Sequence, residues 1–160
     1  MSLFGNDGYQ WRETYFLLFR ESDRPLTEQV SAALEDCARF EVAEIRSDSD
    51  GRFDSLTLIS PDDFSGMDVT FVTGDEVSEH REELLRDMIK TTLTDEERDK
   101  LDELGECNCR FDIFHFEQIP VGESNEEESL DPGGLLIVME RLAELCNGVG
   151  VDPQSGSFMG

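Results

Sequence analysis

His115 and Glu117 are the residues of this chain best suited to catalysis, and they stand two positions apart in the run from Cys109 to Ile119. Side chains two apart on a strand project from the same face, so the carboxylate can orient the imidazole. Such a pair can serve as a general base and its partner, because histidine titrates near neutral pH. No nucleophile in a tight turn and no glycine-rich phosphate loop accompanies them. A half-buried histidine with a hydrogen-bond partner is the commoner arrangement. A structural role is therefore the preferred interpretation, and catalysis by the pair is the alternative.

Acidic residues around Gly51 have part of the spacing of a calcium loop. With Gly51 at the sixth position of an EF-hand, Asp48 and Asp50 stand at the third and fifth ligand positions. The same alignment puts Arg46 at the first ligand position and Thr57 where a bidentate acid belongs. A hairpin tip with solvated acids is therefore the preferred interpretation.

Four cysteines and a histidine raise the question of a soft-metal site. Cys109 and His115 lie six residues apart, which is about 20 Å along a strand that rises about 3.3 Å per residue. They cannot share one zinc ion, which takes four Cys or His ligands, unless the strand breaks between them. Cys37 and Cys146 could approach only through the tertiary fold. We therefore expect no metal and no cofactor.

The charge balance is the strongest compositional feature. There are 38 acidic and 13 basic residues, a formal net charge of −25. Nucleic acids and anionic membranes both require clustered cations, so neither is an expected partner. One explanation is a solvated acidic surface suited to a saline cell. The alternative is an acidic decoy that binds a basic protein surface by imitating the charge of nucleic acid.

Self-repulsion among these charges predicts that salt stabilises the fold. Raising the salt from roughly 10 mM to 200 mM shortens the screening length severalfold. The melting temperature should therefore rise over this range. A melting temperature that falls or stays flat would contradict the prediction.

Length and composition favour one domain, residues 1–160, with enough chain to bury a core. No apolar run approaches the length of a membrane span, and no basic-then-apolar signal opens the chain. The few cysteines are then expected to be reduced thiols. We expect a cytoplasmic protein.

The run from Cys109 to Ile119 predicts a strand at the centre of a sheet, with residues 14–19 as its neighbour. Both of its faces carry large apolar groups, with Phe111 and Ile113 on one and Phe114 and Phe116 on the other. A strand with one solvated face would alternate between apolar and polar residues. We therefore expect a covering layer on both faces: helices on one, and the C-terminal helix, a second subunit or a ligand on the other. Trp11 is the aromatic expected on a surface contact.

Periodicity and cap signals place the other elements. Thr27 is an expected N-cap, and Thr73–Glu76 and Thr94–Glu97 have capping-box spacing. Leu136 and Ile137 broaden the apolar stripe of the last helix, which predicts burial on more than one side. The expected strands are 14–20, 40–46, 53–59, 68–73 and 149–151, the expected helices are 27–38, 76–90, 95–104 and 131–146, and residues 155–160 are expected to be loose.

This order predicts an α+β fold, and its core over residues 14–118 resembles a ferredoxin-like split βαβ sheet, antiparallel or mixed. The resemblance is topological and carries no motif. Additional helices include a C-terminal extension at residues 131–152, which follows an acidic loop at 122–130. That fold serves many unrelated functions, so it implies none in particular.

We therefore expect a non-catalytic binding or regulatory module with an unknown protein or small-molecule partner. A homodimer formed through a sheet face or edge is an alternative assembly. The rival functions are a small enzyme that uses His115 and Glu117, and the acidic decoy.

Overall fold

The computed structural model describes Leu3 and residues 8–36, 40–60, 65–90, 94–118 and 133–159. The strands are β1 (Tyr9–Phe19), β2 (Glu41–Ser47), β3 (Phe53–Ser60), β4 (Ser65–Thr73), β5 (Cys109–Gln118), β6 (Val149–Asp152) and β7 (Ser157–Met159). The helices are α1 (Thr27–Glu35), α2 (Asp75–Met88), α3 (Asp95–Leu104) and α4 (Gly133–Cys146), with a short 3-10 helix, η2 (Glu21–Asp23), before α1. The strands form one sheet in the order β2-β3-β4-β5-β1-β6-β7.

β5 lies at the centre of this sheet, between β4 and β1. Ile113 faces Val69 on one side and Tyr15 on the other, and both pairings are antiparallel. The predicted pairing of the Cys109 strand with residues 14–19 is confirmed. β1 begins earlier than expected, at Tyr9, and a bulge interrupts its register between Trp11 and Glu13.

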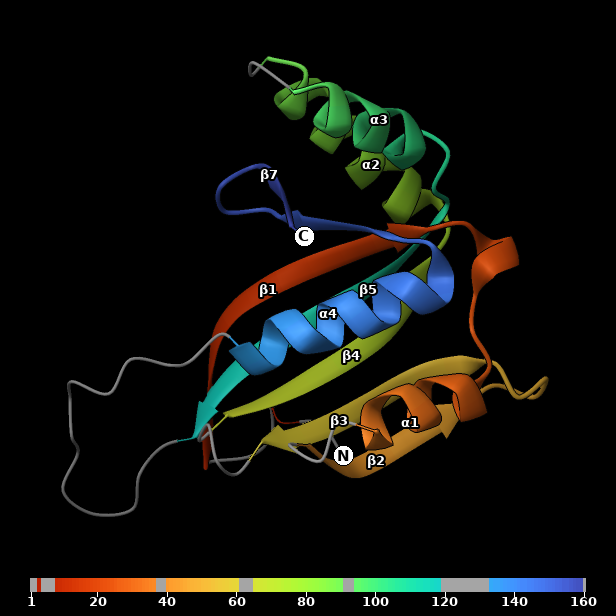
Figure 1. Ribbon diagram of the computed structural model, residues 1–160, viewed down its shortest axis with the longest axis vertical. Helices are drawn as coiled ribbons and strands as arrows, with labels where there is room; N and C mark the ends of the chain where they lie inside the picture. The colour runs from red at the N-terminus through yellow and green to blue at the C-terminus, as the bar shows by residue number, and fades with distance from the viewer. Residues whose placement is uncertain are drawn as a thin grey trace, which may run out of the picture.

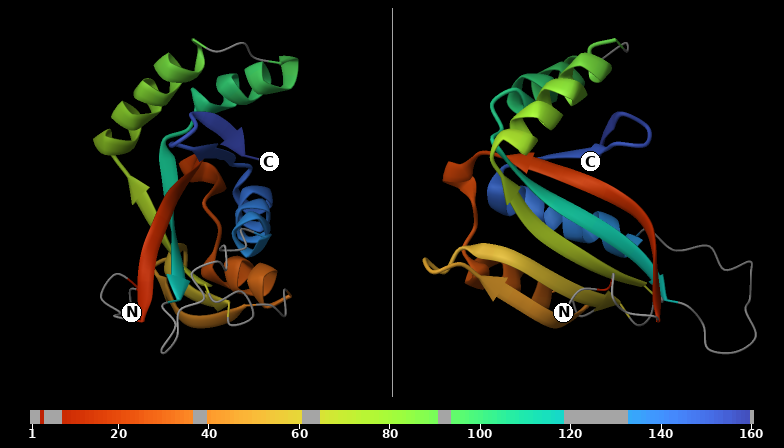
Figure 2. Two further views of the ribbon diagram at one scale, coloured as in Figure 1. Left: turned by 90° about the vertical axis from the view of Figure 1, so that its left-hand side faces the viewer. Right: turned by 180° about the vertical axis from the view of Figure 1, so that it is seen from behind.

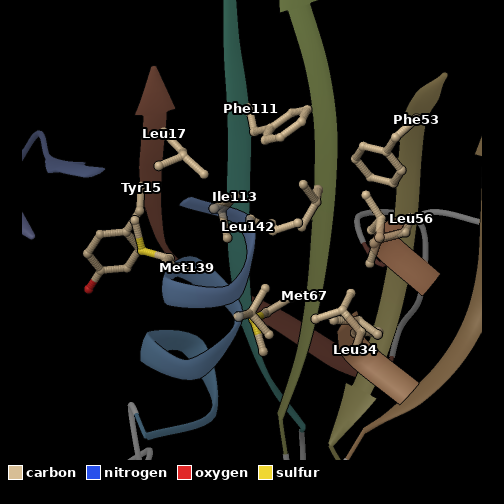
Figure 3. Packing of buried hydrophobic residues seen from close by; sticks show 14 of the residues in the cluster. Tyr15, Leu17, Leu34, Phe53, Leu56, Met67, Phe111, Ile113, Met139 and Leu142 are labelled. Carbon is tan, nitrogen blue, oxygen red and sulfur yellow. The ribbon is translucent and has the colours of Figure 1, made fainter. Parts of the chain in front are cut away.

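One face of the sheet, which carries Phe111 and Ile113 and which we call the helical face, is covered by α1 and α4 (Figure 1). Met139 and Leu142 of α4 lie beside Tyr15 and Ile113 (Figure 3). Leu34 of α1 packs in the same cluster over β3. The main core therefore lies between the sheet and these two helices.

The opposite face, which carries Asp112 and Phe114 and which we call the open face, is covered at one end by α2 and α3. Leu18, Val149 and Val151 pack there against apolar side chains of these two helices, Leu84, Met88 and Leu104. The helices of the described residues leave the rest of this face uncovered (Figure 2). Phe116 is buried, whereas Phe114 is partly exposed.

The cap signals had different outcomes. The Thr94–Glu97 capping box of α3 is confirmed: the Glu97 N–H donates to Thr94 Oγ1 at 3.2 Å and the Thr94 N–H to Glu97 Oε1 at 3.1 Å. The box at Thr73 is wrong, because Gly74 is the N-cap of α2 with a φ of 107° that favours glycine. Thr27 is wrong as an N-cap, because it is already the first residue of α1 and Leu26 precedes it.

The α+β class is confirmed, but the split βαβ arrangement is not. Within the described residues, β1 lies between β5 and β6, every adjacent pair is antiparallel, and the sheet has seven strands. The expectation of a loose end at 155–160 is wrong for residues 157–159, which pair with β6 as β7. The predictions of an acidic loop at 122–130 and of a helix start at 131–132 concern residues outside the described ones. None of the described helices is long and apolar enough to span a membrane.

Arg24 joins the turn after η2 to the sheet. Its guanidinium donates twice to the Phe53 carbonyl, at 3.1 and 2.9 Å, and lies 3.0 Å from an Asp48 carboxylate oxygen. It also stands over the Phe71 ring at 3.8 Å, and only 10% of the side chain is exposed.

Replacing Arg24 by alanine should therefore lower the free energy of unfolding by about 2 kcal/mol, the scale of hydrogen bonds from a charged group plus a cation–π contact. Urea unfolding followed by circular dichroism measures the loss. Arg20 provides the control, because it pairs with Glu106 on the surface and its replacement should cost less than about 1 kcal/mol. Equal losses for the two variants would contradict the prediction.

Candidate functional site

His115 lies on the helical face of β5 and is completely buried. Its cross-strand neighbours are Met67 on β4 and Glu13 on β1. His115 Nδ1 lies 3.5 Å from Glu13 Oε1. The bulge after Trp11 sets the register that places Glu13, rather than Arg12, opposite the imidazole.

Glu117 is directed to a different partner. Its carboxylate lies 3.5 Å from the Arg12 guanidinium, and 31% of its side chain is exposed. Glu13 also forms a hydrogen bond with Tyr15. The pKa of the Tyr15 phenol is raised, mainly by burial and also by this hydrogen bond. The carboxylate that contacts His115 is therefore Glu13, which the spacing argument missed because it comes from another strand. The catalytic role of His115 and Glu117 stays a prediction, and neither lines the two cavities described below.

The cysteines of the described residues are buried thiols. Burial raises the pKa of Cys107 to about 11 and that of Cys146 to about 12, and it also raises the pKa of Cys109. Such thiols stay protonated near neutral pH and are poor nucleophiles. Within the described residues no three His, Cys, Asp or Glu side chains gather as metal ligands. Cys37 lies outside those residues.

The acids around Gly51 form the expected hairpin tip between β2 and β3. Asp48 Oδ1 accepts hydrogen bonds from the backbone N–H groups of Asp50 and Arg52, at 2.9 and 3.0 Å. The bond from Arg52 is the main cause that lowers the pKa of Asp48. Its second oxygen faces Arg24, so this carboxylate organises the turn.

A buried polar cluster at the junction of α2 with the open face was not expected from the sequence. The Arg110 guanidinium bonds both oxygens of Asp112, at 2.5 and 3.3 Å, and contacts His80 Nδ1 at 3.0 Å. It lies 4.9 Å from the centre of the Phe16 ring, which His80 meets edge-on. The cluster links α2 to β5 and β1. No pattern in the local sequence indicates this cluster. Strand alternation places Arg110 on the open face, but the side chains that bury it there come from distant parts of the chain.

Burial, and then the charge of Arg110, lowers the pKa of His80 from 6.5. The carboxylates of Glu83, Asp112 and Glu76 act in the opposite direction but do not reverse the shift. A histidine with a lowered pKa in the fold contributes stability above its unfolded pKa and loses it as the pH falls through the folded value.

The free energy of unfolding of the wild type, minus that of His80→Gln, should therefore decrease as the pH falls from about 7.5 to 5, a window that spans the ordinary histidine pKa. Taking the difference removes the contribution of the carboxylates that the two proteins share. Urea titrations at each pH measure it, and a difference that rises toward acid would contradict the pKa shift.

The open face holds a shallow polar depression of about 200 Å³ beside the uncovered strands. Asp68 forms part of its wall and accepts hydrogen bonds from Thr57 Oγ1 at 2.7 Å and from the Leu3 N–H at 2.9 Å. Glu44 and Arg46 line it and pair with each other at 2.8 Å. These side chains already satisfy one another, so the depression is a weak candidate for a site.

A larger cavity, about 600 Å³, lies between α3, α4 and β6, and we call it the α3–α4 cleft. In Figure 1, β6 and β7 lie between these two helices. Its inner wall is apolar and comes from buried or half-buried residues of three elements, Leu17, Met139, Ala143 and Val149. Leu136 also lines it and is 48% exposed, so the prediction that the broad stripe of α4 is buried on more than one side is wrong at this residue.

The charged residues of the cleft are Lys100 and Glu103 from α3 and Glu140 and Glu144 from α4. The three glutamates are exposed and Lys100 is half-buried. An apolar wall with a few charged groups at its edge is typical of ligand sites, and the volume lies within their usual range of about 300–1,000 Å³. The cleft can therefore bind an apolar group, and its edge favours a cation.

Comparisons with models of protein families, with curated proteins and with solved structures find no match to this chain.

Proposed function

We propose that this protein is a non-catalytic binding module whose ligand or partner inserts an apolar group into the α3–α4 cleft. The observation that carries the proposal is the combination of a buried apolar wall with Leu136 exposed beside it. An exposed leucine at a cavity of this size is more informative than one on a convex surface, where isolated apolar residues are normal.

The chemistry of the cleft supports binding rather than catalysis. Among the described residues that line it, the titratable side chains are one lysine and three glutamates, and none is a histidine, cysteine or serine. The setting that we propose is cytoplasmic, because Cys107, Cys109 and Cys146 are free thiols.

Binding of the neutral apolar dye Nile red tests the proposal. The dye should bind to the wild type with a fluorescence increase, and Leu136→Asp should weaken binding by about tenfold or more, the scale of losing one buried leucine contact. Ile89→Asp is the matched control, because Ile89 is 69% exposed at the end of α2 and does not line the cleft.

Equal dye affinity for the wild type and Leu136→Asp would reject the cleft as the site. Equal weakening by Ile89→Asp would do the same, because the effect would then not be local. Sedimentation of the same samples gives the solution mass, and dye release on dimerisation would assign the cleft to a second copy of the chain.

A further inference from the structure

We propose that the partner at the α3–α4 cleft is a basic amphipathic segment of another protein, with an apolar side chain in the cleft and cationic side chains against Glu140, Glu144 and Glu103. This inference rests on the binding function proposed above and specifies its partner.

The charges at the cleft favour a cation. Of the residues that the structure describes, three carboxylates and one ammonium group line it, and the whole chain carries a net charge of −25. Lys100 also interacts with Glu97 on its own helix. Hydrogen bonds with Thr94 are the main cause that lowers the pKa of Glu97, and the positive charge of Lys100 lowers it further. The field at the cleft therefore attracts cationic segments and repels anionic ones.

The spacing along α4 sets the pattern that a partner must match. Leu136, Glu140 and Glu144 follow one another at intervals of four residues, with Ala143 beside them. Residues four apart lie on one helix face, so an apolar site is followed by two carboxylates over about 12 Å. A partner helix of two turns has this length, and it can present one apolar side chain followed by basic side chains one turn apart. Helices that bind in grooves use apolar anchors at this spacing.

Glu103 extends the acidic edge to the other side of the cleft. It comes from α3, whereas Glu140 and Glu144 come from α4, so carboxylates lie on two elements that flank the apolar wall. A segment in the cleft could then place cations on both sides of its apolar anchor.

The same charges argue against the other occupants. A second copy of this chain carries the same net charge of −25, so the two copies would repel each other. Nucleic acid and anionic lipid would meet carboxylates where they need cations. A basic protein segment is the class whose charge and apolar content both fit.

Three synthetic helical peptides test the inference by fluorescence anisotropy. The first carries leucines at every third or fourth position with flanking arginines, the second has glutamate in place of arginine, and the third has serine in place of leucine. The first should bind at least tenfold more tightly than either of the others. Its affinity should fall between about 20 and 300 mM salt, over which the screening length shortens several-fold.

A pair of charge-matched double variants localises the effect. Glu140→Gln/Glu144→Gln should weaken binding of the first peptide by about three- to tenfold, as expected from two exposed ion pairs. Glu28→Gln/Glu79→Gln removes the same charge from exposed positions outside the cleft and should have a smaller effect. Equal weakening by the two double variants, or equal affinity for the arginine and glutamate peptides, would overturn the inference.

The two proposals fail in distinguishable ways. Nile red binding that depends on Leu136, without preference for the arginine peptide, rejects the basic partner and keeps the binding cleft. Absence of both responses rejects the cleft itself.

Discussion

Replacing Arg110 by methionine is expected to lower the free energy of unfolding by about 3–5 kcal/mol, the cost of breaking a buried ion pair by removing one partner. Arg110 and Asp112 are only 6% and 15% exposed, so water cannot take the place of the lost guanidinium. Burial already raises the pKa of Asp112, and hydrogen bonds from Arg110 act against that rise. Without Arg110 the carboxylate would remain buried and uncompensated, and His80 would lose its contact as well.

A double variant identifies the cause of this loss. Arg110→Met combined with Asp112→Asn also removes the carboxylate that the single variant leaves buried without a partner. The double variant should therefore recover part of the stability lost in Arg110→Met. Arg12→Met is the surface control, because Arg12 is 50% exposed in its pair with Glu117 and should contribute less than about 1 kcal/mol. Urea titrations of the four proteins measure these values. If the double variant is no more stable than Arg110→Met, the buried carboxylate is not the source of the loss.

Phe111→Ala is expected to cost about 3–5 kcal/mol, the usual range for removing a buried phenylalanine. Phe111 is fully buried, and its ring centre lies 4.5 Å from that of Phe19, 5.4 Å from Phe53 and 6.2 Å from Phe71. These rings come from three further strands, so the cavity would open in the middle of the helical face. The surrounding strands are paired and can collapse only partly into it.

Phe114→Ala is the matched control for this prediction. It removes the same side chain from the same strand, but on the open face, where Phe114 is partly exposed. Its loss should be less than half of that for Phe111→Ala. Equal losses would show that the open face buries Phe114 more fully in solution than the structure does, as a bound partner or a second subunit would cause.

Short-range signals in the sequence predicted several elements correctly. The Thr94–Glu97 capping box, the turn at Gly51 and the strand from Cys109 depend on residues close in the chain. The pairing of β5 with β1 was also predictable, because both segments carry apolar groups on both faces.

Positions that depend on register or on remote neighbours were not predictable in this way. A single bulge in β1 puts Glu13 beside His115, while Arg12 takes Glu117. Gly74, with its positive φ, displaced Thr73 as the N-cap of α2. Spacing along one strand cannot reveal a carboxylate that arrives from the next.

The sequence alone determined the α+β class, the central aromatic strand and the strongly acidic charge, because each follows from composition or from periodicity within about ten residues. The tertiary structure alone decided the seven-strand order, the buried Arg110 cluster and the α3–α4 cleft. Each of these joins segments that are far apart in the chain, and their contacts depend on how α2, α3 and α4 pack against the sheet.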